Sequence, residues 1–151
     1  MKKFNYLKVK FFLIFIIFLA KILRIKDLPP IPSVSALIKK KKKMLFILSF
    51  PKNTLNLPGG VIQELETPQQ ALIREVKEET NFDIKVGKVF GIYPWKDKIS
   101  GINFCYEAKI IGGKLKSSSE GKAIWLDPRQ NMQKFTNQTK KKIIKDYLRI
   151  R

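Results

Sequence analysis

Residues 57–82 read LPGGVIQELETPQQALIREVKEETNF, and this stretch decides the fold. It opens with a turn signal, because the two glycines after Pro58 let the backbone come close to a ligand. Thr67 can cap a helix, the next residue is a proline suited to the first helical position, and a glutamine three residues after Thr67 completes a capping box. The pattern predicts a helix that starts at Pro68 and ends at Asn81, which tolerates the left-handed conformation of a helix end.

Three carboxylates lie on one side of this predicted helix. At about 100° per residue, Glu75 and Glu79 are about 40° apart around the axis, and Glu78 is about 60° from Glu75. Like charges at this spacing repel, and the helix dipole disfavours anions near the C-terminal end. A divalent cation would relieve both costs, and oxygen ligands suit magnesium or manganese better than zinc. The alternative is a solvated acidic face paired with Arg74 and Lys77.

The residues before the helix favour the cation. Gly60 is followed after five residues by Glu66 and, after seven more, by the run Arg74-Glu75-Val76-Lys77-Glu78-Glu79-Thr80-Asn81-Phe82. This spacing resembles the Nudix box, the signature of the Nudix hydrolase family. The one departure is Asn81 in place of the final glycine, and asparagine is the next best residue for a left-handed helix end.

The resemblance implies a fold, an activity and a site. The fold would be a Nudix-type α/β/α sandwich with a mixed sheet, and the activity metal-dependent cleavage of a nucleoside diphosphate linked to another group. Magnesium, or else manganese, would be held on the diphosphate by the box carboxylates and one backbone carbonyl, and a polarised water would attack phosphorus. Glu66 and Arg74 would pair to support the loop against the helix. The metal ligands implied are Gly60, Glu75, Glu78 and Glu79.

The residue that takes the proton from water stays open, because Nudix enzymes use either a helix carboxylate or one from a later loop. Glu120 lies where such a loop carboxylate is expected, and its alternative is an ordinary surface role. Leu65 departs from the family, in which a turn former is common before the loop glutamate. This substitution puts the shape of the loop in doubt, and not the ligands.

Composition excludes several other chemistries. The chain has 151 residues, enough for one domain with a short appendage, and it contains no histidine and a single cysteine, Cys105. A serine-histidine triad, a disulfide framework and a thiolate zinc site are therefore excluded. The net charge of +19 is concentrated in short stretches, which include residues 39–43 and the C-terminal tail. No aromatic residues are interleaved in the 39–43 run, so we do not expect nucleic acid as a partner.

Hydrophobic patterning around the box predicts a sheet and a second helix. Two strands joined by the lysine run as a solvated turn precede the box, and further strands and an amphipathic helix follow it. The predicted strands cover residues 33–38, 44–50, 86–95, 102–111 and 123–126, and the predicted helix covers residues 139–150.

Substrate choice lies outside the box, so the sequence leaves it open between a nucleotide and a nucleotide sugar. Tyr93, Pro94 and Trp95 could stack on a base, but packing in the core is the interpretation we favour. An alternative function is a catalytically inactive Nudix-like module that only binds nucleotides. A gap among the box carboxylates would indicate it, and there is none. Nothing in the pattern sets the oligomeric state.

The N-terminal segment indicates a three-part organisation. We predict that residues 1–26 form a basic-flanked hydrophobic helix, residues 27–32 a proline-rich connector, and residues 33–151 the Nudix domain. The apolar run in the helix is half the roughly 20 residues that span a bilayer, which leaves an interfacial anchor, packing on the domain, or a cleaved signal. We expect a cytoplasmic enzyme that residues 3–25 tie to a membrane surface, because the flanking lysines can snorkel.

Fractionation tests this anchor. The full-length chain should sediment with membranes at low salt, and a chain that starts at Asp27 should stay in the soluble fraction. If both remain soluble, the hydrophobic helix belongs to the fold.

Overall fold

The computed structural model describes Phe15, Leu19 and residues 29–51, 53–97, 99–116 and 121–150. The predicted N-terminal helix therefore lies almost entirely outside the described residues, as does its proposed membrane contact. Among the residues that are described, no helix is long and apolar enough to cross a bilayer.

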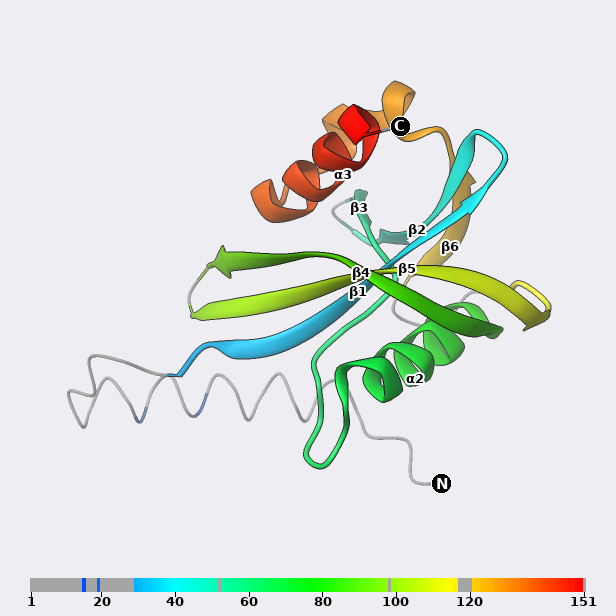
Figure 1. The fold of residues 1–151 in the computed structure, drawn as a ribbon. Helices are drawn as coiled ribbons and strands as arrows, with labels where there is room; N and C mark the ends of the chain where they lie inside the picture. Colours follow the sequence, from blue (N-terminus) through cyan, green and yellow to red (C-terminus); the bar gives the residue numbers. More distant parts are fainter. Residues whose placement is uncertain are drawn as a thin grey trace.

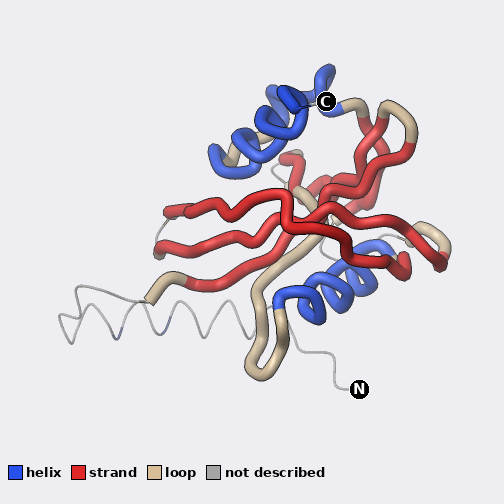
Figure 2. Tube along the Cα trace, in the orientation of Figure 1, coloured by secondary structure: helices blue, strands red, loops and turns tan. Residues whose placement is uncertain are grey.

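A mixed sheet forms the centre of the molecule (Figures 1 and 2). Its main path runs β3-β2-β1-β5-β4, and β6 pairs with the other side of β2. All pairs are antiparallel except β1 with β5, which run parallel over Ile31 to Ile38. The strands are β1 (Ile31–Lys40), β2 (Lys43–Ser49), β3 (Thr54–Asn56), β4 (Phe82–Lys96), β5 (Ser100–Gly113) and β6 (Lys122–Leu126).

Helices cover the sheet on both faces (Figure 1). α2 (Pro68–Thr80) buries Ala71, Leu72 and Val76 in a core that includes alternate residues of β1. α3 (Gln138–Ile150) buries an apolar stripe in a second core, on the opposite face. Because side chains alternate along a strand, β1 feeds both cores. The α/β/α layering expected from the family resemblance is present in the described part of the chain.

Most predicted elements are confirmed, with local corrections. The lysine run makes the predicted hairpin turn, with Lys40 paired to Lys43. The boundary of the connector was wrong, since Ile31 and Pro32 already belong to β1 and pair with β5. Two elements were missed: the three-residue β3 and a 3₁₀ helix, Pro128–Lys134, both too short for a periodic pattern.

The ends of α2 follow the predicted capping. Thr67 accepts from the backbone N–H of Gln70, whose side chain accepts from the N–H of Thr67. At the other end Asn81 is left-handed, with φ of 60°, and its N–H donates to the carbonyl of Lys77. The Asn81 side chain also donates to the carbonyl of Lys114, at 3.0 Å. Asparagine thus serves in the place of the family's glycine.

Replacing Asn81 tests this cap. Asn81→Ala should lower the free energy of unfolding by about 1 kcal/mol, because alanine is penalised in the left-handed region. Asn81→Gly should stay within about 0.5 kcal/mol of wild type, since relief of strain offsets the lost Lys114 bond. Urea denaturation of both variants measures the difference. Equal stabilities of the alanine and glycine variants would contradict this account.

Candidate active site

The loop before α2 runs along the free edge of β1. The carbonyl of Pro58 accepts from the N–H of Ala36, and the carbonyl of Gly60 accepts from the N–H of Val34, both at 2.8 Å. Gly59 has φ of 139°, and a Cβ there would lie 2.2 Å from the carbonyl oxygen of Val34. A side chain at this position is therefore excluded both by backbone conformation and by space.

Two carboxylates of α2 contact this loop. Glu79 is 8% exposed, and its Oε2 accepts from the N–H of Gly59 at 2.9 Å. The carboxylate of Glu75 lies against Gly60 so closely that a Cβ on Gly60 would be 2.5 Å from its Cδ. The two glycines therefore bring the backbone into contact with both carboxylates.

Arg74 connects the loop to the helix. Its Nε and Nη2 donate to the two oxygens of Glu66, at 2.6 and 2.9 Å, and Nη2 also donates to the carbonyl of Val61. Its Nη1 donates to Glu75 at 2.8 Å. The hydrogen bond from Arg74 lowers the pKa of Glu66, and the same bond raises the pKa of Arg74. The geometry is that of a bidentate pair, which fixes orientation as well as charge.

Glu78 is more exposed than the other two carboxylates. Its side chain is 62% exposed, and its nearest described cation is Arg74, at 3.6 Å. In the described part of the chain, no three acidic, cysteine or histidine side chains are close enough together to hold a metal ion as they stand. The structure places Glu75 and Glu79 against the Gly59–Gly60 backbone, and the exposed Glu78 lies beside the same Arg74 nitrogen as Glu75.

The structure describes one of the two loop residues singled out in the sequence, Leu65, and not the other, Glu120. Glu120, the candidate base, falls outside the described residues, and its role stays a prediction. Leu65 is 97% exposed and left-handed, with φ of 64°. The loop thus keeps the turn conformation that the family's usual residue would favour, at a cost of about 1–2 kcal/mol for a leucine.

The aromatic residues after the box are occupied in packing. Tyr93 is buried under α3, where burial followed by the Asp146 carboxylate raises its pKa to about 12. The indole N–H of Trp95 donates to the hydroxyl of Ser33. The packing interpretation of Tyr93 is confirmed, and Trp95 is partly buried.

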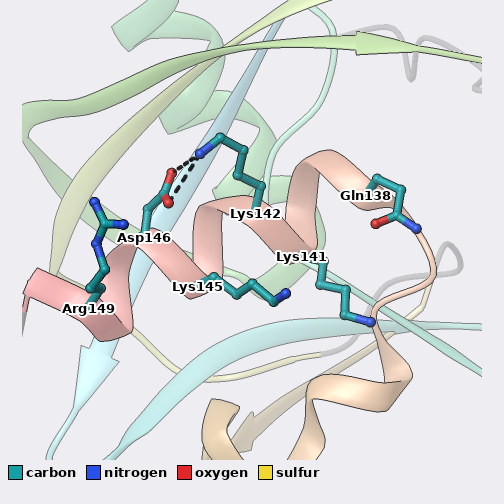
Figure 3. A pocket seen from close by; sticks show the side chains of 6 residues that line it. All are labelled: Gln138, Lys141, Lys142, Lys145, Asp146 and Arg149. Atoms are coloured by element: carbon teal, nitrogen blue, oxygen red, sulfur yellow. Dashed lines mark hydrogen bonds and ion pairs between the residues drawn. The ribbon is translucent and has the colours of Figure 1, made fainter.

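A hollow with a mostly basic lining lies along α3 (Figure 3). No carboxylate of α2 is among the residues that line it. One acidic residue there, Asp146, is paired with Lys142 at 2.9 Å. The lining side chains all come from α3: Gln138, Lys141, Lys142, Lys145, Asp146 and Arg149.

Sequence reasoning missed one cation whose charge is coupled to a carboxylate of α2. Lys140, in the first turn of α3, donates from Nζ to the Oδ1 of Asn56 at 2.5 Å. Burial lowers the pKa of Lys140, and the nearby Glu79 carboxylate opposes that shift. Helical periodicity could have singled out Lys140 in the sequence. It precedes the buried Ile143, Ile144 and Tyr147 by three, four and seven residues, which places it on the same face of the helix.

A model of the NUDIX domain matches residues 29–147. The chain belongs to the Nudix family. Among curated relatives, it is 34% identical over 128 residues to an ADP-ribose pyrophosphatase of Methanocaldococcus jannaschii, covering 81% of this chain and 75% of that protein. It is 36% identical over 105 residues to a MutT-like protein of Streptomyces ambofaciens, covering 66% and 67%. The enzyme is thus a Nudix hydrolase, in a family that generally uses divalent cations and acts on small nucleotide-like substrates.

Solved structures agree with this fold. A NUDIX hydrolase from Nitrosomonas europaea superposes with a TM-score of 0.72 at 24% identity, covering 80% of this chain and 90% of that one. A MutT protein from Methanosarcina mazei superposes with a TM-score of 0.71 at 22% identity, covering 82% and 96%. Both carry the mixed sheet with helices seen in this Nudix domain.

The Glu66–Arg74 pair of the Nudix loop predicts a defined pH dependence. Because the folded pKa of Glu66 is lowered, its stabilising contribution is full above the ordinary value of 4.5 and is lost as pH falls through the folded value. Glu66→Gln should cost about 1–2 kcal/mol at neutral pH, and the difference from wild type should shrink below pH 4.5. Urea denaturation from pH 7 to 3 measures it. A constant difference across that range would show that the pair does not act through the carboxylate charge.

Proposed function

We propose that this Nudix hydrolase is a metal-dependent pyrophosphohydrolase, which cleaves a nucleoside diphosphate linked to another group. The observation that supports it is the contact between the Gly59–Gly60 backbone and the carboxylates of Glu75 and Glu79. Neither contact is needed to build the helix, and each places an anionic oxygen of α2 against the loop.

The donor set at this loop fits a hard divalent cation. Glu75 and Glu79 supply carboxylate oxygens, and Gly60 supplies a carbonyl that has one lone pair engaged by Val34. Glu78 would complete the set once its exposed side chain turns inward. Magnesium is the expected ion and manganese the alternative. When bound, the cation would neutralise charge on the diphosphate and polarise the attacking water.

The protein's own residues then have separate tasks. Arg74 holds the loop against the helix through its ion pair with Glu66. It thereby keeps the metal ligands in position, and Arg74 itself does not contact the substrate. The N–H of Gly59 orients the Glu79 carboxylate by donating to its Oε2. A carboxylate must take the proton from water, since the chain has no histidine, and Glu120 or a carboxylate of α2 would do so.

ADP-ribose is the first substrate to test. The support is the relative from Methanocaldococcus jannaschii, which is named an ADP-ribose pyrophosphatase and matches most of both chains. Hydrolysis would give AMP and ribose 5-phosphate from the single diphosphate bond. A nucleotide such as a nucleoside triphosphate is the second candidate, supported by similarity to MutT-like proteins.

Removing single carboxylate charges tests the site. Glu75→Gln and Glu79→Gln should each lower magnesium-dependent turnover by at least about a hundredfold, because each loses an anionic ligand. The melting temperature without metal should stay the same or rise slightly, since like-charge repulsion is relieved. Phosphate products from ADP-ribose and other nucleoside diphosphate derivatives give the rates.

Glu64→Gln is the matched control, because Glu64 is an exposed carboxylate of the same loop. It should keep the wild-type rate. Near wild-type turnover in both site variants would overturn the assignment of the site.

A further inference from the structure

We infer that Lys140 is a substrate-positioning residue, whose side chain reaches from α3 to bind an anionic oxygen of the substrate beside the carboxylate site. This inference rests on the proposed function. It concerns a residue outside the Nudix box, on a helix that packs against the opposite face of the sheet from α2.

The position of Lys140 is unfavourable for a residue with only a structural role. It lies on the apolar stripe of α3, in line with Ile143, Ile144 and Tyr147, all buried. It also lies in the first turn, where the helix dipole disfavours a cation. The stripe could hold an apolar side chain at this point without either cost, and residues that break local rules are concentrated at functional sites.

A hydrogen bond holds the Lys140 side chain at the end of β3, where the loop begins. Its Nζ donates to the Oδ1 of Asn56, the last residue of β3. The Asn56 amide is itself oriented, because its Nδ2 donates to the hydroxyl of Ser49 at 2.8 Å. Three residues beyond Asn56, the N–H of Gly59 binds Glu79. The ammonium is thus held at the start of the segment that contacts the carboxylates.

The electrostatics point to an anionic substrate group. The negative charge of Glu79 opposes the lowering of the Lys140 pKa that burial causes. In the enzyme with a cation bound, the charge of Glu79 would be shared with that cation, and Lys140 would lose much of its compensation. A diphosphate oxygen beside the cation would restore it, and lysine binds such oxygens as a point charge.

The remaining basic residues of α3 do not share this arrangement. Lys145 is exposed on the outer side, where it lines the hollow with Lys141 and Lys142 (Figure 3). Lys145→Met therefore removes the same charge from the same helix without touching the site, and it serves as the matched control for Lys140→Met.

The test uses two measurements on the full chain. Binding of Mn²⁺ without substrate, followed by the paramagnetic signal of the free ion, should tighten about fivefold in Lys140→Met, because a nearby like charge is removed. The KM for ADP-ribose should rise about tenfold with kcat changed less than about threefold, because an ionic contact to substrate is lost. Lys140→Arg should recover most of the KM, and Lys145→Met should change neither quantity.

Tighter Mn²⁺ binding together with a higher KM distinguishes a substrate-positioning role of Lys140 from a purely structural one. If Lys140 only tethers α3 to β3, its loss should weaken Mn²⁺ and substrate together or leave both unchanged, and either result overturns the inference. If the wild-type enzyme fails to cleave ADP-ribose or other nucleoside diphosphate derivatives, the proposed function fails instead. The Mn²⁺ measurement still decides for Lys140 in that case, because an unchanged affinity shows that its ammonium does not face the site.

Discussion

The rest of the structure depends on one constraint, the close packing of the Gly59–Gly60 backbone between β1 and α2. The loop completes the hydrogen bonding of β1, whose opposite edge pairs in parallel with β5. The same residues contact the carboxylates of Glu75 and Glu79. The same two residues therefore contact both the sheet and the site, and at Gly59 the β1 backbone leaves no room for a side chain.

Charge is distributed in the enzyme so that an acidic site lies within a strongly basic chain. The net charge of +19 would draw anionic substrates toward the protein over long range. Locally, Arg74 and the Gly59 N–H restrain two carboxylates that would otherwise repel each other. In our proposal Lys140 supplies a positive charge from α3 that binds an anionic oxygen of the substrate beside these carboxylates. A diphosphate and a cation together match this mixture of charges.

Local features of the chain were predictable where a local rule applies. The helix from Pro68 to Thr80, its caps and the lysine hairpin follow from capping chemistry and hydrophobic period. The spacing of Glu75, Glu78 and Glu79 predicted that they share one side of the helix. It could not predict that Glu79 is buried and Glu78 exposed, because that depends on how the rest of the fold packs around the helix. The parallel pairing of β1 with β5 and the contact of Lys140 with Asn56 are long-range, and one sequence carries no direct signal for either. The sequence does show a lysine on the apolar stripe of α3, at Lys140. Its contact with Asn56 is seen only in the structure.

The most direct measurement is anomalous X-ray scattering from crystals of the enzyme soaked in Mn²⁺. The account predicts a manganese peak bound by the carboxylates of Glu75 and Glu79 and the carbonyl of Gly60, with Glu78 turned toward it. A peak elsewhere in the molecule, or none at these residues when the ion is saturating, would contradict the claim that this loop and helix form the catalytic metal site.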